Sequence, residues 1–403
     1  MTSWKGRLKS DIRCAFKHHF LRGYGVGRGR NAVALVMGMG EHAPVDGVGK
    51  MDNSSKNQGN DTSSPQLSPR EWKKLVAEFQ NPHVGRAVWQ LINTLVPILT
   101  IWITLYFLKD ISLWLCLPIA MLGGLFMVRA FIIFHDCGHG SFFKSKKANS
   151  VVGFVTGLLT FTPYRQWSWE HARHHATNGD LDRRGIGDIW TLTVEEYVQS
   201  SKWMKFSYRF IRNPIILFLF APLVLFVILQ RLPNSKAKAR EKRSVHIMNI
   251  TLTGWCIGMS MLFGFVDWLV IQLTMMAVAS GFGLWLFYVQ HQFEDTYWAT
   301  GKEWDYTAAA MEGSSFYNLP RILQWFSGNI GFHHIHHLNP QIPNYNLERC
   351  HYSHPFFQQA PELKLFNSLK TIQLRLWDEV NGKMITFREL KRQLAMSQAK
   401  PSI

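Results

Sequence analysis

The chain has 403 residues, of which 47% are hydrophobic and 14% aromatic, and the apolar residues are concentrated in long runs. This distribution predicts an integral membrane protein and argues against nucleic acid as the partner. Lysine and arginine number 44 against 27 aspartates and glutamates, and the net charge of +17 suits anionic lipid headgroups on a cytoplasmic face.

The cysteines include no CxxC pair, and three of them lie in or beside apolar runs. We interpret them as reduced packing residues, which excludes a disulfide framework and a zinc site. They are Cys14, Cys116, Cys137, Cys256 and Cys350.

Residues 1–67 are predicted to be a disordered tail, because stretches such as 51–66 are polar, rich in Ser, Asn and Gly, and lack periodicity. One alternative is a targeting or lipid-binding tail, since residues 1–50 are basic. Another is that Met51 is the true start, which mass spectrometry of the native N-terminus would decide.

Ordered structure is expected to begin at Ser68, where Ser-Pro-Arg-Glu forms a capping box with proline at the first helical position. Trp72, Leu75, Val76 and Phe79 follow at helical spacing. This pattern predicts an amphipathic helix that lies on the membrane surface before the first span.

Four runs are long enough to cross a bilayer: 88–107, 111–134, 247–266 and 267–290. Short connections join them into two hairpins, so the predicted fold is an all-α integral membrane protein with four transmembrane helices, interfacial helices and a cytosolic histidine-rich cap. Arg129, in the second span, is expected to reach the interface by snorkelling.

Two further apolar runs are ambiguous. Residues 151–162 are too few to span, and residues 214–230 are borderline. The basic segment 231–243 should stay in the cytoplasm. We therefore prefer 214–230 as a segment that lies in the interface or dips and returns, which keeps all histidine groups on one face.

Histidines gather in four places at helical spacing. Residues i, i+3 and i+4 of a helix lie within about 100° of arc, so HxxxH and HxxHH imidazoles can converge on one point. His334 points away from that arc. The convergent set is His135 and His139, then His171, His174 and His175, then His291, and finally His333, His336 and His337.

Nine imidazoles held close together would repel one another if they were charged, so we expect neutral rings that bind metal. Nine ligands are too many for one ion and suit two. Spacing does not name the metal, because zinc, copper and nickel also accept imidazole. A single HxxxH pair, or His291 alone, is more often an ordinary histidine. Carboxylates nearby are candidates to accept the second ring N–H of a ligand: Asp136, Glu170, Asp180, Asp182, Asp188 and Glu294.

The groups HDCGH, HARHH and GFHHIHH resemble the three histidine boxes of the membrane fatty acid desaturases. Further stretches, including HHATNGDLDRRGIGDIW, EGSSFYNLP and HLNPQIPNYNLE, resemble one branch of that family, the bacterial acyl-lipid desaturases of the Bacillus type. The resemblance covers roughly 68–390. It implies a desaturase domain over 68–395, and we expect a flexible tail over 396–403.

The resemblance implies that the nine convergent histidines hold two irons, with O2 as co-substrate. The implied reaction introduces a cis double bond into membrane phospholipid acyl chains, with Δ5 favoured and Δ12 or ω-6 open. An apolar tunnel would hold the chain, with Trp167, Trp169 and Trp285 as candidate lining residues.

Electrons must come from another protein, because the sequence has neither a dinucleotide-binding fingerprint nor a His-Pro-Gly-Gly haem motif. The resemblance implies ferredoxin or flavodoxin as the donor, docking on a basic surface. It also implies a location in the plasma membrane with the active site facing the cytoplasm.

Two rival functions stay open at this point. A diiron hydroxylase shares similar histidine boxes, and product analysis would separate it from a desaturase. A metal transporter usually places its ligands near mid-membrane, whereas these histidines fall at helix ends and in connecting segments.

Overall fold

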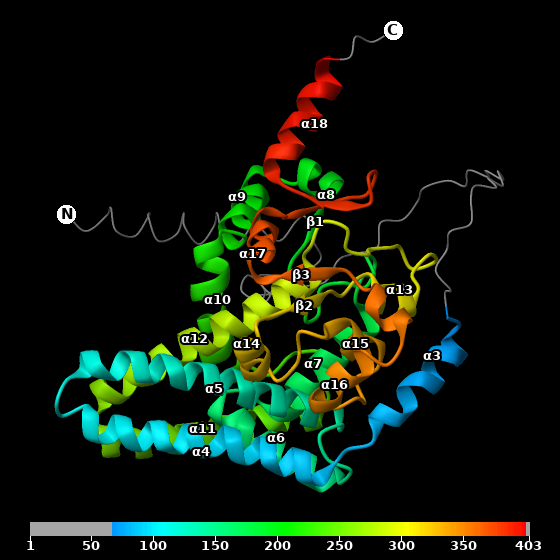
Figure 1. The fold of residues 1–403 in the computed structure, drawn as a ribbon. Helices are drawn as coiled ribbons and strands as arrows, with labels where there is room; N and C mark the ends of the chain where they lie inside the picture. The colour runs from blue at the N-terminus through cyan, green and yellow to red at the C-terminus, as the bar shows by residue number, and fades with distance from the viewer. Residues whose placement is uncertain (1–66, 400–403) are drawn as a thin grey trace, which may run out of the picture.

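The computed structural model describes residues 67–399. The predicted tail, the possible start at Met51 and Cys14 therefore lie outside the described residues. The described chain is mainly helical, with long helices packed side by side and a cap of shorter elements at one end (Figure 1). We use "the cap" for residues 164–213 and 292–399.

Within residues 67–399, four helices are long and apolar enough to cross a membrane, as predicted. They are α4 (Val84–Leu108), α5 (Leu113–His139), α11 (Ala239–Phe263) and α12 (Phe265–His291). They form the two expected hairpins. The helices run past the predicted ends of the spans because α5 continues through the HDCGH motif and stops only at Gly140, whose φ of 74° suits a glycine C-cap.

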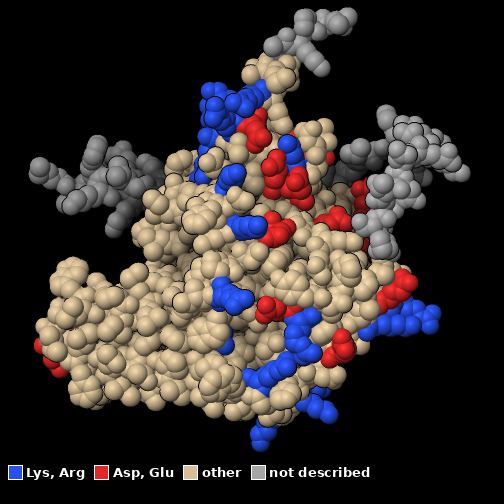
Figure 2. Space-filling view, in the orientation of Figure 1, with Lys and Arg blue, Asp and Glu red and all other residues tan. Residues whose placement is uncertain are grey.

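The outer surface of the four long helices is apolar. Exposed side chains along α4 include Trp89, Ile92, Leu99 and Phe107. Figure 2 shows a face almost free of charge over these helices, with Lys, Arg, Asp and Glu gathered over the cap. Such a surface is stable only against lipid, so the predicted membrane protein class is confirmed.

Helices α5 and α12 pack closely because glycine on α5 allows it. A Cβ atom added to Gly124 would lie 2.6 Å from the Val278 Cβ and 2.8 Å from the Met275 carbonyl oxygen. Small residues at such positions let helix backbones approach within the bilayer. This contact holds the two histidine-bearing helix ends next to each other.

The prediction that Arg129 snorkels to the interface is wrong. Its guanidinium is buried, donates to the Asn93 side chain and the Trp325 carbonyl, and stacks 4.0 Å from the Trp325 ring centroid. The short helix α14 (Arg321–Phe326) covers this part of α5 and supplies the partners that water would otherwise provide.

Shorter helices make up most of the rest. Before and between the spans lie α3 (Pro69–Val76), η2 (Ala77–Gln80), α6 (Lys146–Leu159), α7 (Tyr164–Thr177), α8 (Val194–Gln199), α9 (Lys202–Ile211), η3 (Ile216–Phe220), α10 (Ala221–Val227) and η4 (Leu229–Arg231). After α12 come α13 (Tyr306–Met311), α14, α15 (His333–Leu338), α16 (Asn344–His351), η5 (Pro355–Gln359), α17 (Leu365–Ser368), η6 (Leu369–Gln373) and α18 (Phe387–Ala399).

Very short strands add two small sheets to the predicted all-α fold. The first has the order β1-β4-β5, with β1 parallel to β4 and β4 antiparallel to β5. The second pairs β2 with β3 in parallel. The strands are β1 (Leu192–Thr193), β2 (Phe316–Asn318), β3 (Glu362–Lys364), β4 (Leu376–Asp378) and β5 (Lys383–Ile385). They connect distant segments of the cap.

The predicted capping box at the start of α3 is present, with the Glu71 carboxylate accepting from the Ser68 backbone N–H at 2.8 Å. The predicted surface role is wrong. Trp72, Val76 and Phe79 are buried in the same core cluster as residues of the cap, and Trp72 Nε1 donates to Thr307. The apolar face of this segment therefore packs against protein rather than lipid.

The contacts at the two ends of the segment around 214–230 agree with the preferred interpretation, in which it lies in the interface or dips and returns. Helix α9 and the run from Ile216 to Arg231 meet at a bend of 64°. Just before the bend, Arg212 donates to Gln292, directly after α12. Just after the run, the Leu232 carbonyl accepts from Gln166 on α7. Both ends are thus held on the histidine side.

Two smaller expectations concern the C-terminus and the cysteines. Helix α18 continues to Ala399, so the predicted tail boundary at residue 395 falls inside a helix, and residues 400–403 lie outside the described residues.

The four cysteines in the described part of the chain form no disulfide, and three of them are buried. This agrees with reduced packing residues.

Candidate metal centre

Four elements bring the predicted histidines to one place. Helix α5 ends on His139, α7 carries the HARHH group, α12 ends on His291, and α15 begins at His333. The turn before α15 passes through Gly328 and Asn329, both with positive φ, which turns the chain back toward α5.

The side chains form two groups that could each hold a metal ion, and in each the ligand atoms lie within 4.8 Å of one another. The first group consists of His135, His139, His171, His175 and His336. The second consists of His174, His291 and His337. The ninth, His333, places its Nε2 3.0 Å from the Nε2 of His291.

The two groups touch each other. The rings of His175 and His337, one from each group, stack with centroids 4.2 Å apart. Within the first group, the Nε2 atoms of His175 and His336 lie 2.9 Å apart. All nine predicted histidines therefore lie in one continuous cluster, as two neighbouring sets.

Hydrogen bonds to the second ring nitrogen fix the orientation of three of these rings. His135 Nδ1 lies 3.0 Å from Asp136, His174 Nδ1 lies 2.6 Å from Asp188, and His291 Nδ1 lies 3.1 Å from the Gly313 carbonyl. When Nδ1–H donates to such an acceptor, Nε2 keeps its lone pair and faces the site.

The other predicted carboxylates have different partners. Glu170 accepts from Asn234 at 3.0 Å, and burial raises the pKa of Glu170 to about 7. Asp180 pairs with Arg183, the Asp182 carboxylate accepts from the Gly301 N–H, and Glu294 lies 3.6 Å from Lys383.

Burial, and then the neighbouring imidazoles, hold the pKa values of His171, His175, His333, His336 and His337 well below the usual range. These rings are therefore neutral and offer lone pairs. Among the nine predicted ligands, six buried ring nitrogens have no hydrogen-bond partner within the described residues: His139 Nε2, His174 Nε2, His175 Nδ1, His333 Nδ1, His336 Nδ1 and His337 Nε2. Buried nitrogens without partners are unfavourable unless a metal or another ligand satisfies them.

His334 faces away from the cluster, as predicted. Its Nε2 lies 3.0 Å from His351 Nδ1 and 2.9 Å from the Phe357 carbonyl. His351 is thus a partner of His334 and lies outside the metal groups. Sequence reasoning missed Asn344, whose backbone and side-chain N–H groups both donate to Asp136 and so hold the carboxylate that contacts His135.

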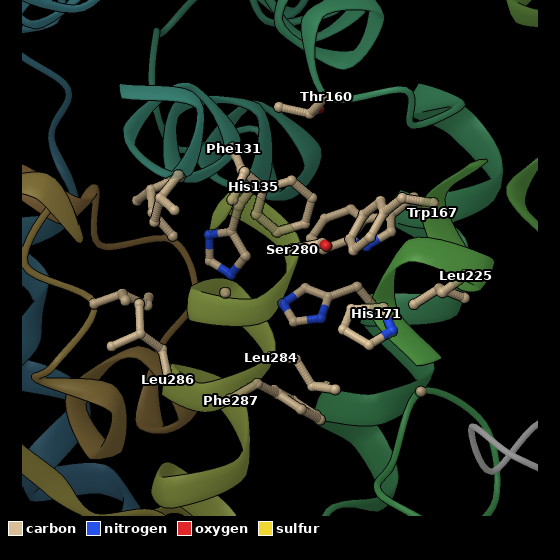
Figure 3. Close-up of a pocket in the computed structure, with 18 of the residues that line it drawn as sticks. Phe131, His135, Thr160, Trp167, His171, Leu225, Ser280, Leu284, Leu286 and Phe287 are labelled. Carbon is tan, nitrogen blue, oxygen red and sulfur yellow. The ribbon is translucent and has the colours of Figure 1, made fainter. Parts of the chain in front are cut away.

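An apolar cavity reaches the histidine cluster (Figure 3). His135, His171 and His333 line one part of it, and Phe131, Trp167 and other apolar side chains line the rest. Trp167 is thus a lining residue, as predicted. Trp169 and Trp285 are not, because Trp169 stacks with Arg173 and the Trp285 indole donates to Tyr317.

Four apolar helices, two of which end at a buried cluster of imidazoles beside an apolar cavity, define an integral membrane protein with a histidine-rich site that could bind metal. A family model described as fatty acid desaturase matches residues 112–365. The chain belongs to this family. The predicted enzyme class, a desaturase and hence an oxidoreductase, is confirmed.

Similar proteins come from bacteria and plants. The chain is 42% identical over 322 residues to a fatty acid desaturase from Bacillus subtilis, covering 80% of this chain and 92% of the relative. It is 27% identical over 294 residues to the sn-1 oleoyl-lipid 12-desaturase of Synechocystis, covering 69% and 81%. It is 30% identical over 256 residues to the sn-2 acyl-lipid omega-3 desaturase (ferredoxin) of Helianthus annuus, covering 58% and 54%. The resemblance to the Bacillus type is thus confirmed, and family membership favours a desaturase over a metal transporter.

Proposed function

We propose that the protein is an O2-dependent acyl-lipid desaturase that introduces a cis double bond into membrane lipid acyl chains at two irons held by the nine histidines. The observation that carries this proposal is the apolar cavity whose wall includes His135, His171 and His333. When bound, the irons would supply the oxidising chemistry with O2 that removes two hydrogens from neighbouring methylenes. Two electrons and two protons from outside complete the reduction of O2 to two waters.

The residues of the chain hold and orient the reactants. Asp136 and Asp188 fix the tautomers of His135 and His174, so that Nε2 is the free ligand atom. Phe131 and Trp167 confine an acyl chain in the cavity and exclude water from the histidine wall. Such confinement selects which methylenes react, because the chain itself offers no polar group at the reacting carbons.

We propose Δ5 as the position of the double bond, on phospholipid acyl chains, from the similarity to the Bacillus type. The names of the other relatives keep Δ12 or ω-6 as alternatives. Expression in a host that lacks unsaturated fatty acids, followed by double-bond mapping, tests this. A hydroxylated lipid without new double bonds would instead support a hydroxylase.

The proposed electron donor is ferredoxin or flavodoxin, and the proposed location is the plasma membrane with the histidine side facing the cytoplasm. Two relatives carry ferredoxin in their names. Reconstitution with each purified donor in turn tests the first proposal. Labelling of cysteines introduced at exposed positions of 236–243, in intact cells and in lysed cells, tests the second.

The ligand set is tested by metal content. His336→Ala and His174→Ala each remove one ligand from a different group, so each is expected to abolish desaturation and to lower the bound iron of the purified protein. His246→Ala, at an exposed position on α11, is the matched control and should retain both. Full activity and iron in either first variant would remove that histidine from the ligand set.

A further inference from the structure

Apart from the histidines, the wall of the apolar cavity contains two buried polar side chains that each have an oxygen without a partner. Gln230 is 4% exposed and Ser280 is 5% exposed. Neither Gln230 Oε1 nor Ser280 Oγ has a hydrogen-bond partner among the described residues, and both residues line the cavity. A buried polar atom left unpaired costs about 1–3 kcal/mol. The Ser280 hydroxyl can rotate to donate to the carbonyl four residues earlier in its own helix, so it is Gln230 for which a bound molecule is expected to supply the missing partner.

These two residues lie at different depths. Gln230 lies at the end of the segment 214–230. Just after it, the Leu232 carbonyl accepts from Gln166 and the Asn234 side chain donates to Glu170, and both of these partners are on α7. Gln230 is therefore held at the level of the histidine-bearing helix. Ser280 lies 11 positions before His291 on α12, about 16 Å away along the helix axis, and its hydroxyl lies among the cavity side chains in Figure 3.

The acyl chain of a lipid carries one polar group that could reach such a cavity, the ester carbonyl at its carboxyl end. A carbonyl oxygen only accepts hydrogen bonds, so its partner must donate. The amide of Gln230 can present either its oxygen or its NH2 group to the cavity, because a half-turn of the amide exchanges them. The part of the cavity wall at Gln230 thus suits the ester, and the apolar part that includes Met276 suits the hydrocarbon.

We propose that the Gln230 amide donates to the ester carbonyl of the bound acyl chain, so that the enzyme measures the position of the double bond from the carboxyl end. This inference rests on the proposed desaturase function. The methyl end runs past Ser280 toward Met276. Gln230 is a specificity-determining residue in this account, while the histidines carry the reaction.

The first test varies the length of the substrate. The wild-type protein is expressed in a host that lacks unsaturated fatty acids and is supplied with palmitoyl or stearoyl chains, which differ by two carbons. Mapping should place the double bond at the same distance from the carbonyl in both. A constant distance from the methyl end would overturn the inference. No unsaturated product from the wild type would contradict the proposed function instead.

The second test changes the anchor. Gln230→Leu keeps the approximate volume but removes the donor, so the double bond should spread over neighbouring positions and the apparent KM should rise about 3- to 10-fold. Gln230→Asn keeps an amide but withdraws it by one methylene, and it should also broaden the product distribution. Gln272→Leu replaces another buried glutamine, on α12 and outside the cavity lining, and should keep one position.

The inference can be tested even if one variant does not fold. If Gln230→Leu does not accumulate in the membrane, the product distribution and KM of Gln230→Asn test the inference instead. An unchanged double-bond position and KM in whichever variant folds would mean that water, rather than the ester, occupies the site at Gln230, and would overturn the inference.

Discussion

Single carboxylates control how the histidines present their lone pairs. Asp188 shows this most clearly, because one oxygen lies 2.6 Å from His174 Nδ1 and the other accepts from the Gly185 N–H. The backbone therefore positions the carboxylate, and the carboxylate positions the ring.

Asp188→Asn should lower metal affinity about 10- to 100-fold, because the amide no longer favours the tautomer with a free Nε2. Metal content of the purified protein, measured over a series of chelator concentrations, checks this. Asp182→Asn is the control, since Asp182 is exposed and its carboxylate accepts from the Gly301 N–H rather than from a histidine. Equal chelator resistance in Asp188→Asn and the wild type would show that the carboxylate has no such role.

At the residue scale, helical spacing was sufficient to predict which histidines converge and that His334 does not. Spacing could not assign Asp136 and Asp188 as acceptors over Glu170 or Asp180, because all four lie near a histidine group in the sequence. Only the folded chain shows that Glu170 faces Asn234 and Asp180 faces Arg183.

Helices in this protein are positioned by two kinds of contact, close backbone packing within the spans and apolar anchors in the cap. Gly124 represents the first and Trp72 the second. The contacts of both residues help to hold the histidine-bearing elements in position, although neither residue contacts the two histidine groups.

Gly124→Ala should lower the thermal stability of the protein in detergent, because the added methyl group would overlap Val278 and the Met275 carbonyl. Gly258→Ala on α11 meets nothing within 4 Å and is the matched control. It should be neutral or raise stability by up to about 1 kcal/mol through helix propensity. Equal melting temperatures for the two variants would show that α5 and α12 do not depend on this contact.

Trp72→Ala should destabilise the protein by about 3–5 kcal/mol, the range typical of removing a buried tryptophan. Trp72 is 2% exposed and packs in the core shared with the cap. Denaturant unfolding monitored by fluorescence of the remaining tryptophans measures the change, with exposed Lys74→Ala as the control. A loss of membrane association without loss of stability would restore the surface role expected from the sequence.

At the element scale, the four spans, the capping box and the returning segment followed from apolar length, spacing and basic flanks. The packing partner of α3 did not follow, because an apolar stripe is compatible with lipid and with protein. The burial of Arg129 was missed for a related reason, since α14 comes almost 200 residues later in the chain.

Charge is divided unevenly over the whole molecule. The long helices present an apolar surface, whereas charged residues lie over the cap and the nearby helix ends (Figure 2). Exposed Lys146 and Lys147 begin α6, just after the end of α5 that carries His139. An acidic electron donor would be attracted to this side of the protein.

Reversing both charges, with Lys146→Glu and Lys147→Glu together, should slow electron transfer from an acidic donor about 10-fold at low ionic strength, and the difference should shrink as salt is added. Lys109→Glu, between the first two spans at their far end, should have little effect. Stopped-flow oxidation of reduced donor measures these rates. A rate that does not depend on salt in the wild type would exclude charge-guided docking.

At the scale of the molecule, composition and four apolar runs were sufficient to predict a membrane protein with two hairpins and histidines on one side. The arrangement of the cap was not predictable, because its contacts join segments far apart in the chain. The parallel pairing of β1 with β4 joins residues 192 and 376, and nothing local to either strand encodes it.

Each of the two metal-binding groups contains one residue of α15, His336 in the first and His337 in the second. Both arrive after the second hairpin has been synthesised. A nascent chain therefore completes neither group until these two residues have been synthesised, and a product truncated before residue 336 lacks one histidine of each group. We therefore expect full metal binding only late in biogenesis, which would distinguish finished molecules from fragments already inserted in the bilayer.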